Sequence, residues 1–284
     1  MKYKSYLIAI LWGIQFCFTL PVSAQNTIQQ QKDSLRRAIE QSDGTDKLRL
    51  YYLYMSEIAD DRKMDTLLTL FGQTEAEAIR QGNVKMQGMV YGNTIISHIN
   101  RNEYDKIIQK APGYLDFYIL HEQWKLYYQI HMQLITAYNL KGDYKKAAEE
   151  AKLMFDRAKA RKDKAGMATA LYATAITYNV QDRWKEEEDC FRECIRLLWE
   201  VSGYDNILTQ AYAFLCSSLR AQGQYDKLLQ LVPEYEKAIA RFEKAAGRTQ
   251  PEAWGNLYVA LMNTYIDTKD YDKAGEYLAK LEGI

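Results

Sequence analysis

An aromatic residue recurs along this chain at a nearly constant spacing, and this periodicity restricts the fold more than any other feature. The spacings are 40, 40, 41 and 46 residues, and a methionine lies a further 40 residues upstream. A period of this length is typical of arrays in which one supersecondary unit is repeated and stacked. Six units would account for nearly all of the chain after its first 24 residues. The recurring positions are Met64, Tyr104, Tyr144, Trp184, Tyr225 and Tyr271.

The residues around each recurring position follow helical spacing. Two rows, thirteen and six residues before it, are seven residues apart and therefore share one helix face. Rows three and seven residues after it form an apolar stripe on a second helix, interrupted only at Glu187. Each unit is thus predicted to be an antiparallel helix pair that buries its apolar faces by stacking on its neighbours. The four rows are Tyr51, Tyr91, His131, Leu171, Tyr212 and Tyr258; Ile58, His98, Tyr138, Tyr178, Leu219 and Tyr265; Leu67, Ile107, Ala147, Glu187, Leu228 and Ala274; and Phe71, Ala111, Ala151, Phe191, Val232 and Leu278.

Composition supports long helices and excludes several classes of protein. Only 15 glycines and 4 prolines occur among 284 residues, and 48% of the residues are hydrophobic, which excludes wholesale disorder. The 37 basic and 37 acidic side chains cancel, so no global field attracts nucleic acid or an anionic membrane. The basic run from Arg157 to Lys164 lies at the end of a second helix, where it complements the helix dipole.

The unit from Tyr128 to Arg161 resembles the tetratricopeptide repeat (TPR). It carries Tyr138, Gly142, Tyr144 and Ala147 at the spacing of that family. HEAT and armadillo repeats also have periods near 40 residues, but a turn followed by an aromatic residue and then alanine favours the TPR. The resemblance implies an all-α, right-handed solenoid of about six degenerate antiparallel helix pairs.

This chain also departs from the family pattern. Its period is about 40 residues, whereas TPR units have about 34. The turn position of Gly142 is occupied elsewhere by Asn102, Asp182, Gly223 and Lys269. Two second helices carry a proline at the same place, Pro112 and Pro233, and we expect a break or a kink there.

The N-terminus predicts export. Lys2 and Lys4 precede an apolar stretch from Tyr6 to Leu20, and Val22-Ser23-Ala24 provides the small side chains that signal peptidase accepts. The stretch is shorter than the roughly 20 apolar residues of a spanning helix. We therefore predict a signal peptide over residues 1–24, cleaved near Ala24, and a mature periplasmic protein of a Gram-negative envelope without a membrane span. Residues 25–46 should form a capping helix and loop, and residues 47–284 the repeat domain.

The two ends of the repeat domain raise a further expectation. The segment from Asp33 to Glu40, after an export signal and before degenerate repeats, resembles the periplasmic input region of bacterial two-component sensor kinases. At the other end no polar capping helix follows the last unit before Ile284. We expect a partner protein, or a continuation of the chain, to cover the apolar face of that unit.

The sequence contains no pattern that indicates catalysis. It lacks a phosphate-binding glycine loop, a nucleophile elbow and a zinc-protease helix motif, so we expect no enzyme activity, cofactor or metal. His98, His121 and His131 lie on different helices and are expected to pack rather than to bind a metal.

The cysteines allow two interpretations. Cys190 and Cys194 share a helix face but are too far apart to bridge. Cys194 and Cys216 fall where a second helix should pack on the next first helix. Buried free thiols are favoured, and export leaves a disulfide between Cys194 and Cys216 open.

The candidate binding site is the concave face of the first helices. Stacked pairs curve into a groove that presents side chains outside the core. Asn139 and Asn179 occupy equivalent positions, where an amide ladder would hold an extended peptide, although asparagine near a helix end is also an ordinary cap. We predict a non-catalytic interaction module for a protein or peptide partner, the alternative being a periplasmic ligand-sensing region of a two-component sensor or transcriptional regulator. The predicted groove residues are Met132, Thr136, Asn139, Tyr172, Ile176, Asn179, Ser217 and Arg220.

Overall fold

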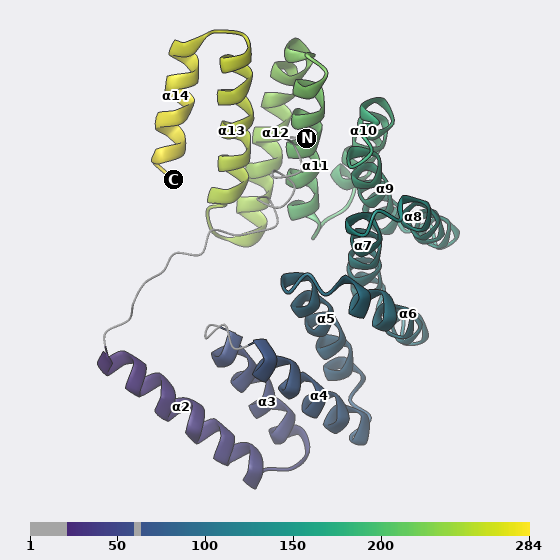
Figure 1. Cartoon of the computed structure of the whole chain (residues 1–284), viewed down its shortest axis with the longest axis vertical. Coiled ribbons are helices and arrows are strands. Elements are labelled where there is room, and N and C mark those ends of the chain that lie inside the picture. Colours follow the sequence, from purple (N-terminus) through teal and green to yellow (C-terminus); the bar gives the residue numbers. More distant parts are fainter. Residues whose placement is uncertain (1–21, 60–63) are drawn as a thin grey trace. The chain divides into compact units, whose positions relative to one another are not determined.

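The computed structural model describes residues 22–59 and 64–284, and over these two ranges the regular structure is entirely helical (Figure 1). Thirteen helices lie in the described ranges. They belong to two compact units, residues 1–86 and 87–284. Each unit is described by itself below.

The first unit contains α2 (Val22–Gln41), α3 (Gly44–Ala59) and α4 (Met64–Arg80). The middle helix, α3, packs on both others. The core of this unit includes Leu48 and Tyr51 on α3 and Phe71 on α4. The helix α2 lies where the sequence predicted a capping helix, within residues 25–46, but it begins at Val22. Residues 1–21, which make up most of the predicted signal peptide, lie outside the described residues, and so does the side chain of Ile58.

The second unit is built from consecutive helix pairs, as the spacing predicted. Each recurring aromatic residue is the first residue of a second helix, and Met64 holds the same place in the first unit. The longer last spacing falls mainly in α12, which has 22 residues where the other second helices have 12 to 17. The first helices are α5 (Val84–Asn100), α7 (Trp124–Leu140), α9 (Lys164–Asn179), α11 (Asp205–Ala221) and α13 (Pro251–Asp267), and the second helices are α6 (Tyr104–Leu120), α8 (Tyr144–Ala160), α10 (Trp184–Trp199), α12 (Tyr225–Ala246) and α14 (Tyr271–Glu282).

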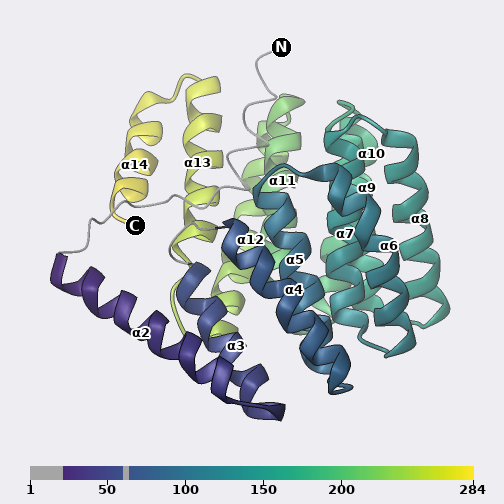
Figure 2. The ribbon, with the colours of Figure 1, turned by 60° about the horizontal axis from the view of Figure 1, so that its bottom comes forward.

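Successive pairs stack through contacts of each second helix with the next first helix, as between α8 and α9, and through contacts between first helices. Besides its partner, α9 packs on α7 and on α11, and α11 packs on α13 (Figures 1 and 2). The row three residues after each recurring position is buried in every pair, including the carboxyl side chain of Glu187. One buried cluster extends from α5 to α9 around Tyr118 and Tyr127, and a second extends from α9 to α13 around Phe191 and Tyr212. The two clusters share α9.

A residue in the left-handed conformation reverses the chain inside every pair of the second unit. At these positions φ lies between 57° and 79°. The N–H of the following residue then bonds to a carbonyl in the last turn of the first helix, as from Asp143 to Tyr138 at 2.9 Å. The positions are the ones that match Gly142 in the sequence, namely Asn102, Gly142, Asp182, Gly223 and Lys269.

A tyrosine next to a cation strengthens three of these turns. Lys146 lies over the ring of Tyr138, and Lys273 over the ring of Tyr265, at 5.5 and 5.1 Å from the ring centroids. The Arg183 guanidinium lies 4.4 Å from the ring of Tyr178. In these three pairs the tyrosine six residues before the recurring position therefore joins the two helices.

Neither proline ends its helix. The break expected at Pro112 and Pro233 does not occur, because α6 and α12 continue through them. Both prolines are exposed, so the backbone carbonyl that loses its helical partner lies on the solvent side. The last predicted stripe residue also differs from expectation: Leu278 is 45% exposed, since α14 packs on α13 alone among the described helices.

A guanidinium ties three helices of the second unit together. Nε of Arg241, on α12, lies 2.6 Å from Oδ1 of Asp205 at the start of α11. The same guanidinium donates to the carbonyls of Leu198 and Val201 at the end of α10. One side chain thus contacts carbonyl groups at the C-terminal end of α10 and the carboxylate in the first turn of α11.

Within the described ranges, the chain has no helix with the length and apolar character needed to cross a bilayer.

Candidate functional site

The first helices α7, α9, α11 and α13 form a layer. On α7, α11 and α13 one side of this layer carries half-buried and exposed side chains, whereas on α9 most of the equivalent positions are buried. On α7 the uncovered positions recur with helical spacing, from the exposed Gln129 to the half-buried Thr136. The equivalent positions on the other three helices follow from the repeat spacing. We define this surface as the open face, and its central residues are Gln129, Met132, Gln133, Thr136, Ile176, Gln210, Ala213, Ser217, Asn256, Val259 and Asn263.

Four of the predicted groove residues lie on the open face. Met132, Thr136 and Ile176 are half-buried, and Ser217 is exposed. The hydroxyl of Thr136 donates to the carbonyl of Met132 at 2.9 Å, which leaves its methyl group at the surface. Whether these side chains contact a ligand stays a prediction.

Tyr172 and Asn139 are placed differently from the expectation, because both are buried, with 7% and 6% of their surface exposed. The ring of Tyr172 packs edge-on against Phe191 and Phe214, at centroid distances of 5.7 and 6.0 Å. Asn139 donates to the hydroxyl of Thr177 on α9, at 3.0 Å. Since α9 lies between two other first helices, little of its surface stays open.

Asn179 and Arg220 are engaged in contacts between helices. The amide of Asn179 donates to Oε1 of Glu187 at 3.0 Å. Nε of Arg220 lies 2.7 Å from Oδ2 of Asp267 on α13. Both predicted rungs of the amide ladder, Asn139 and Asn179, therefore already have partners inside the array.

Burial changes the chemistry of Glu187. Its side chain is fully buried, and this burial raises the pKa of the carboxyl to about 8. Hydrogen bonding to Asn179 and Ser218 opposes the shift, and the charge of Asp182 adds to it. The sequence showed that Glu187 is the single polar residue of its apolar stripe. It did not predict the raised pKa, which favours the neutral carboxyl group.

Sequence reasoning missed a set of amides on the open face. Gln129 and Gln210 occupy equivalent positions two units apart, so the repeat spacing could have found them. Tyr172 donates to Oε1 of Gln210 at 3.3 Å. The other members make no hydrogen bond to the described residues, and they are Gln129, Gln133, Asn256 and Asn263.

Charged groups lie towards the ends of the open face. Lys125, at the start of α7, lies 5.6 Å from the centroid of the Tyr204 ring. Arg220 and Asp267 neutralise each other at the C-terminal ends of α11 and α13. The centre of the face is therefore apolar and amide-lined.

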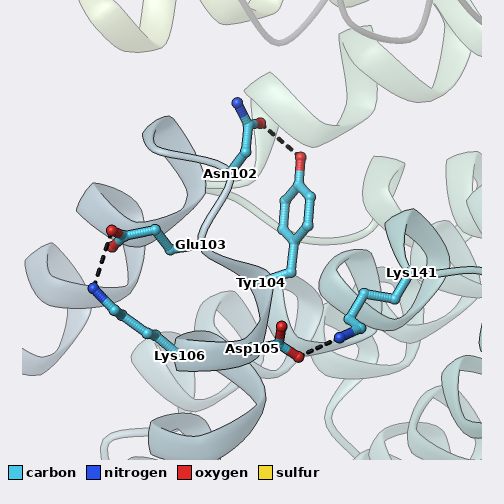
Figure 3. A pocket seen from close by; sticks show the side chains of 6 residues that line it. All are labelled: Asn102, Glu103, Tyr104, Asp105, Lys106 and Lys141. Carbon is cyan, nitrogen blue, oxygen red and sulfur yellow. Dashed lines mark hydrogen bonds and ion pairs between the residues drawn. The ribbon is translucent and has the colours of Figure 1, made fainter.

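A second depression lies at the turns before α6 and α8 (Figure 3). It is lined by Asn102, Glu103, Tyr104, Asp105, Lys106 and Lys141. The Tyr104 hydroxyl donates to Asn102 at 2.6 Å, and the ammonium of Lys106 lies 3.0 Å from Glu103. Lys141 and Asp105 form an ion pair across it. Because its polar groups bind one another, this depression is a weaker candidate than the open face.

The histidines take part in packing contacts. Nδ1 of His98 lies 2.7 Å from Glu103, and burial lowers the pKa of this imidazole. His131 lies between the Tyr127 hydroxyl, at 2.9 Å, and the Glu150 carboxylate, at 2.7 Å. His121 packs on Phe117 at a centroid distance of 4.5 Å. The described residues contain no cluster of three potential metal ligands.

Cys190, Cys194 and Cys216 are free thiols in the described part of the chain. Cys194 and Cys216 are buried in the same cluster, and whether they pair on oxidation stays a prediction. Burial raises the pKa of Cys216 to about 12, so its thiol stays protonated at neutral pH.

Comparison with known proteins supports the fold. No family model and no curated protein matches the sequence. A Rap protein crystallised with competence and sporulation factor aligns with a TM-score of 0.58 at 14% identity, over 88% of this chain and 78% of that one. A STAND protein with a TPR sensor, from Pyrococcus horikoshii, aligns with a TM-score of 0.62 at 13% identity, over 92% of this chain and 40% of that one.

NprR, crystallised with its cognate peptide NprX, aligns with a TM-score of 0.52 at 14% identity, over 99% of this chain and 82% of that one. Identities this low carry information on fold alone. Together with the helix pairs and their turns, these likenesses show that the chain has the fold of a TPR-like helical repeat protein, an all-α solenoid.

Proposed function

We propose that this chain is a non-catalytic interaction module that binds a peptide or protein segment on the open face of α7, α9, α11 and α13. The observation that carries the proposal is the open face itself, which presents apolar and amide side chains on α7, α11 and α13 and Ile176 on α9 between them. Rap and NprR are TPR-like proteins whose crystal structures hold a peptide or signalling factor, which supports a peptide ligand for this fold.

The buried titratable groups support a binding role rather than catalysis. His98, His131 and Glu187 each hydrogen-bond to a neighbouring residue of the helix array. A catalytic acid or base must instead reach a substrate. We therefore propose that these groups set the packing of the array.

We further propose that the protein is exported and works in the periplasm. The support is the N-terminal pattern of Lys2, Lys4 and the small residues before Gln25. Mass spectrometry of the protein recovered from the envelope should give a mature N-terminus near Gln25. A protein that retains Met1 and fractionates with the cytoplasm would refute export.

The binding proposal is tested with arginine substitutions on the open face. The exposed positions Ser217 and Val259 are suitable, and Leu153→Arg on the outer side of α8 is a matched control. A partner captured from the native envelope by the wild type and by Leu153→Arg should be lost from the Ser217→Arg, Val259→Arg double variant. If all three proteins capture the same partner equally, binding occurs elsewhere.

A sensing role is the second candidate. The STAND protein has a TPR sensor. The segment from Asp33 to Glu40 of this chain resembles two-component input regions. In that case ligand binding should be transmitted to a membrane-bound effector. Cross-linking in intact cells would show a membrane partner for a sensor and none for a free scaffold.

A further inference from the structure

The buried carboxyl of Glu187 lies where two successive helix pairs meet. It is in the first turn of α10, and it is hydrogen-bonded to Asn179 at the end of α9 and to Ser218 near the end of α11. Both α9 and α11 pack on α10. We propose that Glu187 is a proton-controlled latch: its neutral form holds α11 against α10, and its ionised form opens this end of the joint between the two helices.

Among the described residues, no opposite charge lies beside this carboxyl to balance it on ionisation. The charge that acts on Glu187 is the negative one of Asp182, in the turn before α10. On α10 itself, burial raises the pKa of the Cys190 thiol to about 11, so that it stays neutral, and the exposed Lys185 and Asp189 point away by helical spacing. An ionised carboxylate in this interior would therefore lose its hydration without gaining a partner.

The cations of the neighbouring segments bind other groups. Arg183, just before α10, donates to Glu186 at 2.7 Å. On α11, Nε of Arg220 lies 2.7 Å from Oδ2 of Asp267 on α13. An ionised Glu187 would recruit one of these cations only by breaking an existing ion pair, so exposure to water is the cheaper response to ionisation.

The opposite end of the same joint is held by an ion pair and by main-chain hydrogen bonds. Because α10 and α11 are antiparallel, the end of α10 lies beside the start of α11. Arg241 reaches from α12 to Asp205 at the start of α11, at 2.6 Å, and donates to the carbonyls of Leu198 and Val201 at the end of α10. This junction ties the two helices together far from Glu187.

Between its two ends the joint is apolar. Phe191 on α10 stacks on Phe214 of α11 with 5.7 Å between the ring centroids. The hydrogen bond from Tyr172 on α9 to Gln210, at 3.3 Å, lies in the half of α11 nearer to Arg241. Ring contacts fix no single direction, so α11 can turn about the Arg241 junction while α10 stays on α9. The joint thus has a hinge at one end and the latch at the other.

The open face crosses this joint. Ile176 on α9 lies one turn before Asn179, and Ser217 on α11 is next to Ser218, so both are at the latch end. Opening separates them, and a ligand that bridges α9 and α11 would bind less tightly as the pH rises. This consequence rests on the proposed function, whereas the latch itself does not.

The test is hydrogen exchange of the full chain at pH 6.5 and at pH 9, with protection corrected for the faster exchange of unstructured chains at high pH. The amides of the last two turns of α11 and the first two turns of α10 should lose protection by about tenfold or more, because the open latch releases its proton at a lower pH than the closed one. The first half of α11 and the helices α6, α7 and α8 should change by less than about twofold. An equal loss throughout the array, or none at the latch end, overturns the proposal.

Two variants assign the effect to the carboxyl. Glu187→Gln keeps the hydrogen bond with Asn179 but cannot ionise, so its protection at pH 9 should equal that at pH 6.5. Asp189→Asn removes an exposed acid from the same helix and should lose protection as the wild type does. Loss of protection in Glu187→Gln at pH 9 would overturn the latch.

A measurement on the wild type keeps the test independent of the variants. In protein with labelled glutamate carboxyl carbons, the resonance of Glu187 should titrate with a midpoint at about pH 8. The loss of protection at the latch end should follow the same curve. A carboxyl titration that is complete while α10 and α11 keep their protection would show that ionisation does not open the joint.

Discussion

The side-chain amide of Asn179 donates a hydrogen bond to Oε1 of Glu187, at 3.0 Å, and links the end of α9 to the first turn of α10. The carboxyl that accepts it is fully buried, at a position where the five other units have leucine, isoleucine or alanine. A buried carboxyl is stable in its neutral form, and the pKa of Glu187 is raised to about 8 by burial.

This raised pKa predicts that the protein loses stability as the pH rises from about 4.5 to about 8. In this window the native state keeps a proton that the unfolded chain has released, so unfolding is favoured by increasing pH. Glu187→Gln keeps the hydrogen bond without the titration, and we expect about 4 kcal/mol more stability than wild type at pH 8. Urea unfolding between pH 5 and 9 measures this. Asp189→Asn, at an exposed neighbour, is the control, and a wild-type slope that survives in Glu187→Gln would contradict the prediction.

Replacing Arg241 should weaken the junction of α10, α11 and α12. Arg241→Lys removes the forked donor that binds both Asp205 and the carbonyls at the end of α10, and leaves the carboxylate of Asp205 buried. We expect a loss of about 3 kcal/mol in the free energy of unfolding. Arg196→Lys, at an exposed arginine that binds Glu193 and Glu200, should cost less than about 0.5 kcal/mol. Equal losses of stability in the two variants would show that the contacts of Arg241 contribute no more than those of an exposed arginine.

The turn residue of the last pair is a site for stabilisation. Lys269 has a φ of 64°, a backbone conformation that is strained for any residue with a side chain. The equivalent Gly142 also has a positive φ but carries no side chain. Lys269→Gly is expected to raise the free energy of unfolding by up to about 1 kcal/mol, and Gly142→Lys to lower it by a similar amount. The two thermal midpoints should move in opposite directions; movement in the same direction would exclude backbone strain as the cause.

Tyr128 requires glycine at position 166. A methyl group on Gly166 would lie 2.2 Å from Cζ of the Tyr128 ring, and that ring is almost fully buried. Gly166→Ala should therefore cost about 2 to 3 kcal/mol. Gly113 is also helical but has open space around it, so Gly113→Ala should be neutral or stabilising by up to about 1 kcal/mol. Denaturant unfolding of both variants measures these effects. A similar loss of stability in both would show that the contact with Tyr128 is not the cause.

The repeat spacing was enough to predict the helix pairs. The recurring aromatic residues begin the second helices, and the position of Gly142 has the left-handed conformation in each turn of the second unit. These features depend on neighbours a few residues apart, which a sequence displays directly. The same reasoning gave the burial of Ile107 and Ala147.

The candidate site was harder to predict because it depends on contacts between units. Periodicity places Tyr172 and Asn139 on the same face as Met132, but the flanking first helices and aromatic rings bury them. The pairing of Arg220 with Asp267 joins residues 47 positions apart. Such contacts depend on how α9, α11 and α13 pack, and no local pattern encodes them.

The extra residues in the last spacing are accommodated almost wholly by a longer α12, and the pair after it still stacks on α11. The insertion leaves the contact between α11 and α13 in place, although α12 packs on α13 less closely than the earlier second helices pack on the first helices that follow them. Its effect stays local because each pair meets only the pairs beside it. A gene that encodes such an array can change length by whole units through duplication or deletion while the remaining units keep their contacts.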